Sequence, residues 1–88
     1  MKADIRLRLE AAIREAPALG DRVLISELIE MMEPLGIRRQ QVSASVGALK
    51  IDAKAHGRRG SHRVASVSAE DAERMIGWLL ETRRAGDD

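Results

Sequence analysis

The spacing of the apolar residues changes twice along this chain, and these changes constrain its fold. Up to residue 50 the apolar residues recur every three or four positions, which is typical of amphipathic helices. Over residues 51–67 they alternate with polar residues around a glycine-rich stretch, which indicates the two strands of a hairpin. From Ser68 the helical spacing returns. The sequence therefore predicts an α+β fold that is mainly α-helical.

Turn residues and capping residues set the limits of the predicted elements. Pro17 and Gly36 allow the chain to leave the first and second helices, and the hydroxyls of Ser26 and Ser68 are candidate N-caps. The predicted elements are, in order, a helix at residues 2–16, a short strand at 23–25, a helix from 26 to about 33, a helix at about 38–50, a hairpin over 51–67 and a helix at about 68–84.

Length and composition exclude several classes of protein. A chain of 88 residues is long enough for one domain, which we expect at residues 1–84, followed by a disordered tail at 85–88. No apolar run reaches the ~18 to 20 residues that span a bilayer, so we expect a soluble, cytoplasmic protein. There is no cysteine, and we expect no metal and no cofactor. Trp78 is the single Trp, Phe or Tyr, so the chain cannot form a surface of several aromatic side chains on which the bases of a single-stranded nucleic acid would stack.

Positive charge is concentrated in the middle of the chain. Residues 37–67 carry seven basic residues and the single acid Asp52, a formal net charge of +6, whereas the two flanks together carry −5. Such a segment is suited to a polyanionic partner, because basic groups that neutralise phosphates release counterions.

Residues 35–49, LGIRRQQVSASVGAL, resemble the turn and recognition helix of bacterial helix-turn-helix proteins. The order of elements over about residues 5–67 is similar to the winged-helix branch of that superfamily, in which three helices and a hairpin "wing" present one helix to the DNA major groove. Arg38 stands where that family often has a capping Ser or Thr. The resemblance implies a sequence-specific double-stranded DNA-binding protein, such as a small bacterial transcriptional regulator or a phage or plasmid accessory factor, associated with the nucleoid when bound.

The candidate DNA contacts lie on the outward face of the predicted third helix and on the hairpin. Gln40 is centred opposite the buried positions, and its amide can pair with adenine. Gly47 on the same face indicates either close approach of a DNA backbone or helix packing. The full set of candidates is Arg38, Arg39, Gln40, Gln41, Ser43, Ala44, Gly47, Lys50, Lys54, Arg58, Arg59, His62 and Arg63.

The sequence also indicates a possible dimer interface and an alternative function. Leu7 and Trp78 lie off the inner stripes of their helices and are candidates for a homodimer interface. The alternative function is a protein-interaction module, an inhibitor or assembly factor, that binds an acidic partner surface. We expect no enzyme and no small-molecule substrate, because the sequence contains no constellation of catalytic residues.

Overall fold

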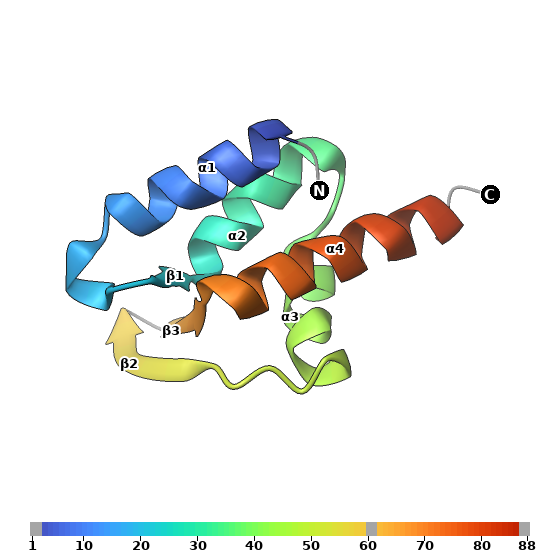
Figure 1. The fold of residues 1–88 in the computed structure, drawn as a ribbon. Helices are drawn as coiled ribbons and strands as arrows, with labels where there is room; N and C mark the ends of the chain where they lie inside the picture. Colours follow the sequence, from blue (N-terminus) through green and yellow to red (C-terminus); the bar gives the residue numbers. More distant parts are fainter. Residues whose placement is uncertain (1–2, 60–61, 87–88) are drawn as a thin grey trace.

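Helices and strands follow one another in the order that the apolar spacing predicts (Figure 1). The structure is a computed structural model that describes residues 3–59 and 62–86, and it describes the side chains of residues 3–57 and 64–82. Within this part of the chain the architecture is α+β and mainly helical. Its elements are α1 (Ala3–Arg14), the 3-10 turn η1 (Pro17–Leu19), β1 (Arg22–Leu24), α2 (Ile25–Met32), the 3-10 turn η2 (Glu33–Leu35), α3 (Arg39–Ala48), β2 (Lys54–Arg59), β3 (His62–Ser68) and α4 (Ala69–Gly86).

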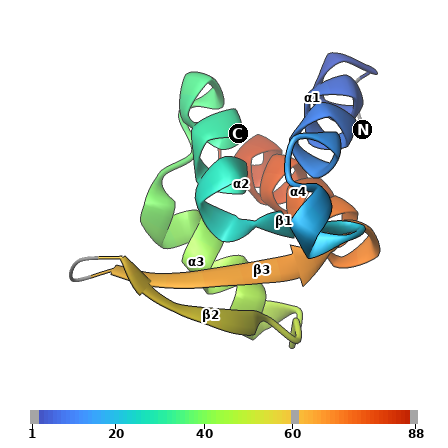
Figure 2. The same cartoon turned by 90° about the vertical axis from the view of Figure 1, so that its left-hand side faces the viewer.

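The described strands form one antiparallel sheet in the order β1-β3-β2. Val23 of β1 lies opposite Val67 of β3, and Lys54 of β2 lies opposite Ser66 of β3. Val23 and Val67 are both buried in the core, so the neighbouring residue Ser66 lies on the other face of the sheet. Figure 2 shows the β2–β3 hairpin extending past β1 and beyond the helices.

The core lies between one face of the sheet and the helices, and each of the four α-helices contributes to it. The last helix presents the predicted stripe, of which four residues are buried and the fifth is half-buried: Ala72, Met75, Ile76, Leu79 and Leu80. Each α-helix thus packs by one face, as its apolar spacing requires.

The inner face of α3 differs in part from the prediction. Val42 is buried as predicted, but Val46 and Leu49 are only half-buried. Ser45, which the sequence analysis did not place inside, is fully buried. Its Oγ donates to the Val42 carbonyl, so the hydroxyl is satisfied within the helix.

The two predicted serine caps have different outcomes. Ser68 caps α4, because its Oγ accepts the backbone N–H of Asp71 at 3.1 Å. Ser26 does not cap α2, since the helix begins at Ile25 and no side chain caps it. The N-cap residue Leu24 is still paired with Ser66 of β3, so the chain passes directly from strand to helix. Ser26 therefore lies inside the first turn, and this prediction was wrong.

The first strand of the hairpin is displaced from its predicted position. It begins at Lys54 rather than Ile51, because the Ile51 N–H bonds to the Val46 carbonyl at 2.9 Å and closes the end of α3. Gly57 does not interrupt the strand. Its positive φ of 96° falls within an irregularity of the β2–β3 pairing, and β2 continues to Arg59.

The two terminal helices also differ from their predicted limits. The first ends at Arg14, before the predicted limit at residue 16. The last continues to Gly86, so residues 85 and 86 are helical and not part of a disordered tail, while Asp87 and Asp88 lie outside the described residues. In the described part of the chain, none of the helices is both long and apolar enough to cross a membrane.

The turn between α2 and α3 depends on a left-handed glycine. Gly36 has a φ of 81°, and its N–H bonds to the Glu33 carbonyl at 2.9 Å. The next N–H, that of Ile37, bonds to the Met32 carbonyl at 3.2 Å. These bonds satisfy carbonyls at the end of the helix while the chain changes direction toward α3.

We expect Gly36→Ala to lower the free energy of unfolding by about 1 kcal/mol, because an L-residue is strained in this region. An added Cβ would meet no atom within 4 Å, so the backbone alone causes the loss. Gly77 is the matched control, since it is exposed within α4 and has equal room. Gly77→Ala should raise the free energy of unfolding by roughly 0.5 to 1 kcal/mol. Denaturant unfolding measures both changes, and destabilisation by both substitutions would contradict this explanation.

Candidate functional site

The outward face of α3 is polar, small and exposed, as predicted. It lies opposite the buried residues Val42 and Ser45. The exposed residues on this face are Arg39, Gln40, Ser43, Ala44 and Gly47. The helix contains no acidic residue, so nothing on this face repels an anion.

Gly47 has no packing role within the described chain. A Cβ at this position would meet no atom within 4 Å, and the residue is exposed. Packing against a neighbouring element of the same chain is therefore not the reason for this glycine.

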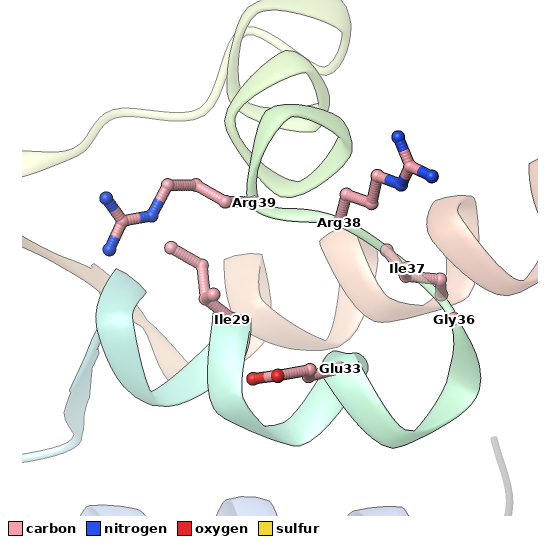
Figure 3. Close-up of a pocket in the computed structure, with 6 residues that line it drawn as sticks. All are labelled: Ile29, Glu33, Gly36, Ile37, Arg38 and Arg39. Atoms are coloured by element: carbon pink, nitrogen blue, oxygen red, sulfur yellow. The ribbon is translucent and has the colours of Figure 1, made fainter.

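The start of α3 borders an open pocket of about 560 Å³ (Figure 3). The pocket is lined by Ile29, Glu33, Gly36, Ile37, Arg38 and Arg39. Figure 3 shows the side chains of Arg38 and Arg39 pointing in opposite directions, with Arg39 on the side of Ile29. The two neighbouring guanidinium groups therefore do not converge on one anion.

Gln41 has a structural role at the start of α3. Its Oε1 accepts the backbone N–H of Arg38 at 2.7 Å and so satisfies one of the free donors at the helix start. Arg38 is the N-cap residue, but a guanidinium has no acceptor and cannot cap the helix itself. The amide of Gln41 is thus engaged within the chain, and its DNA contact stays a prediction.

The end of α3 places Lys50 in an unfavourable backbone conformation. Lys50 donates its N–H to the Gly47 carbonyl at 3.3 Å, and Ile51 donates to Val46 at 2.9 Å. This pattern requires a left-handed residue at position 50, where glycine is usual. Lys50 has a φ of 52° and is the single non-glycine residue with positive φ in the described part of the chain. Its side chain is exposed.

Helix α4 holds this end of α3. Arg74 donates from Nη2 to the Leu49 carbonyl at 3.2 Å and from Nη1 to Asp71 Oδ1 at 3.2 Å. The Asp71 N–H in turn bonds to Ser68 Oγ at the end of β3. The guanidinium also complements the partial negative charge of a helix C-terminus. A hydrogen-bonded path thus connects the sheet to the residue before Lys50.

Of the predicted hairpin contacts, the structure describes the side chain of Lys54 alone. Lys54 is exposed at the start of β2. Arg58 pairs with Arg63 and Arg59 pairs with His62 across the two strands. The side chains of these four residues lie outside the described part of the structure, so their DNA contacts stay predictions.

The ion pairs between described residues include none of the predicted DNA contacts. They are Arg6–Glu73 at 2.8 Å, which joins α1 to α4, and Arg74–Asp71 at 3.2 Å within α4. In the described part of the chain, four of the predicted cationic contacts have no carboxylate within 4.0 Å: Arg38, Arg39, Lys50 and Lys54. Their charges are not neutralised internally.

A second polar cluster, which the sequence analysis missed, lies on the outer face of the sheet. Ser66 is fully buried in β3, and its Oγ accepts from Arg22 Nε at 2.9 Å. The Arg22 Nη2 donates to the Ser66 carbonyl at 2.9 Å, and His56 Nε2 lies 2.6 Å from Ser66 Oγ. These residues come from three strands, and Arg22 and Ser66 are 44 positions apart, so local spacing could not reveal the cluster.

The two predicted dimer residues differ in exposure. Leu7 is 62% exposed on α1, whereas the other large apolar side chains among the described residues are buried or half-buried. Trp78 is half-buried and packs against the core cluster. Part of the indole is therefore used within the chain.

Comparison with known proteins gives no match to a family model, a curated protein or a solved structure. Within residues 3–59 and 62–86, no group of three or more His, Asp or Glu side chains is arranged to hold a metal ion.

We expect Lys50→Gly to raise the free energy of unfolding by about 0.5 to 1 kcal/mol, because glycine removes the left-handed strain at the end of α3. Lys50→Gln is the matched control, since it removes the charge but keeps the strain. Thermal or denaturant unfolding of both variants measures the difference. Equal stability of the two variants would contradict the assignment of strain to the backbone.

Proposed function

We propose that this protein is a winged-helix domain that binds double-stranded DNA in a sequence-specific manner. In this proposal α3 is the recognition helix, β2 and β3 form the wing, and α4 is an added helix that supports α3. The protein acts by binding and not by catalysis, as a small regulator or accessory factor.

The arrangement of the elements supports this proposal. Two helices joined through η2 and Gly36 precede a hairpin, and β1 pairs with β3 in the same sheet. The hairpin extends beyond the helices on the side where α3 lies (Figure 2). A winged helix requires a hairpin beside its recognition helix, so that both can contact one duplex.

The observation that carries the proposal is the character of the outward face of α3. A helix that enters the major groove must present side chains that are exposed, polar and small enough for close approach. All four residues Gln40, Ser43, Ala44 and Gly47 are exposed; Gln40 and Ser43 supply polar groups, Ala44 and Gly47 are small enough for close approach, and packing within the described chain does not require glycine at position 47. Lys50 ends this face with an exposed cation.

The contacts divide into those that position the protein and those that read bases. Arg39 and Lys50 flank the α3 face and are suited to phosphates, which fix register without reading sequence. Gln40 at the centre can offer a donor and an acceptor to adenine. Ser43 can contact several bases, and Ala44 can contact a thymine methyl group.

The test of this proposal is selection of bound duplexes from a random pool at controlled salt. We expect the wild type to select a defined site. Gln40→Ala should lose preference at one base pair, by roughly 1 to 3 kcal/mol, and keep its affinity for unrelated duplexes. Lys50→Gln should weaken binding to all duplexes and lower the slope of log K against log salt by about 0.9.

A third variant, Lys50→Gly, separates the effect of the Lys50 charge from the effect of its strained backbone. Lys50→Gly should bind DNA as weakly as Lys50→Gln although it is the more stable variant, so loss of binding cannot be attributed to loss of folding. Unchanged binding in all three variants would contradict the proposed surface. Absence of duplex binding by the wild type at low salt, with binding to acidic peptides, would favour the protein-interaction alternative.

We also propose that the domain acts as a homodimer in which the exposed Leu7 takes part. Leu7 is the better test position, because Trp78 also packs against the core. Leu7→Glu should convert the dimer to a monomer. The variant should remain folded, because Leu7 makes no contribution to the core of the single chain. Sedimentation measures the mass of both proteins, and a monomeric wild type would refute the dimer.

A further inference from the structure

We propose that the outer face of the sheet holds a second phosphate-binding site, formed by Arg22, His56 and Lys54 around the buried Ser66. Its ligand is a phosphate oxyanion, and its source in the bound complex is a phosphodiester group of the duplex. The choice of this source rests on the proposed DNA-binding function, whereas the oxyanion site itself does not.

The guanidinium of Arg22 is held in place before any ligand binds. Nε donates to Ser66 Oγ and Nη2 donates to the Ser66 carbonyl, both at 2.9 Å. These two bonds use one edge of the guanidinium. Three of its five N–H donors remain, two on Nη1 and one on Nη2, and none of them bonds to an acceptor of a described residue. The remaining edge matches two oxygens of a phosphate.

Ser66 is the anchor of the site. Its side chain is fully buried although it is polar, and its hydroxyl lies between Arg22 and His56. A buried polar group needs hydrogen-bond partners, and here both side-chain partners are basic. Fixing Arg22 in this way lowers the entropy that its long side chain would lose on binding a ligand.

The charged residues within the three strands are all basic. Lys54 lies directly opposite Ser66 on β2 and is exposed on the same face of the sheet. The three strands contain no Asp or Glu in their sequences. Arg22 also takes part in neither of the two ion pairs between described residues. An anion at this face therefore meets no internal competitor for Arg22 among those residues.

The site is separate from the surface of α3. In Figure 2 the hairpin lies in front and α3 passes behind it. The site lies at the base of the hairpin, where β1 joins the sheet. Arg22 and Lys50 belong to different elements, β1 and the end of α3, so in this proposal each contacts a phosphate of its own.

Titration with inorganic phosphate tests the oxyanion site without DNA. At constant ionic strength, phosphate in place of chloride should shift the amide resonances of β1 and β3 and the Nε–H resonance of Arg22 in a saturable manner. Arg22→Gln should abolish these shifts. Ser66→Ala keeps the charge but removes the anchor, and it should weaken phosphate binding severalfold. Arg8→Gln is the matched control, because it removes one exposed arginine from α1 and should change nothing.

Titration with duplex DNA tests the source of the phosphate. Arg22→Gln should lower the salt slope by about 0.9, and combining it with Lys50→Gln should lower the slope by about twice that value, because the two contacts are separate. Dispersed amide resonances show whether each variant is folded. If Arg22→Gln does not fold, the salt slope of Ser66→Ala is measured instead.

Each other result overturns a defined part of the proposal. Absence of phosphate-induced shifts in the wild type removes the oxyanion site, even if the duplex still binds through α3. Phosphate binding with an unchanged salt slope in Arg22→Gln shows a site for free anions and removes the duplex phosphodiester. Phosphate binding by a protein that binds no duplex keeps the oxyanion site and refutes the proposed function.

Discussion

The carbonyl end of α3 is the junction on which the proposed binding surface depends. Ile51 closes the last turn through its bond to Val46, and Arg74 of α4 bonds to the Leu49 carbonyl. Between these two contacts Lys50 adopts a left-handed backbone conformation, and the chain then turns toward β2. These hydrogen bonds therefore fix both the backbone at Lys50 and the direction in which the chain leaves α3.

Two positions near this junction lower stability without any internal contact that explains them. Gly47 lies in a helix with open space around it, and Lys50 holds a conformation that favours glycine. Each costs on the order of 1 kcal/mol relative to the better residue, in a domain class whose total stability is only about 5 to 15 kcal/mol. Unfavourable local choices of this kind cluster at functional sites. Their position on one exposed face is therefore stronger support for a binding role than positive charge alone.

Much of the fold could be predicted because its signals are local. The apolar stripe of α4, the cap by Ser68 and the left-handed turn at Gly36 all depend on residues within one or two turns of each other. The error at Ser26 came from a contact between distant segments. Pairing of Leu24 with β3 moved the start of α2 past the prediction at Ser26.

The candidate site was predictable to a smaller extent. The outward face of α3 follows from helical spacing, and its exposed residues are those that the spacing identifies. The engagement of Gln41 at the helix start depends on which way one side chain turns. The cluster of Arg22, Ser66 and His56 depends on sheet register, which joins residues 44 and 10 positions apart. Spacing along a sequence carries no information about such cross-strand contacts.

The distribution of charge gives the two proposed phosphate surfaces a common physical basis. A net charge of +1 provides almost no overall attraction to a polyanion, so binding must arise from the separation of charge within the domain. Two acids of α4 are held in ion pairs, Glu73 with Arg6 and Asp71 with Arg74. Helix α3 and the three strands contain none. In the proposed complex, this separation of charge favours the orientation that presents α3 and the sheet to DNA.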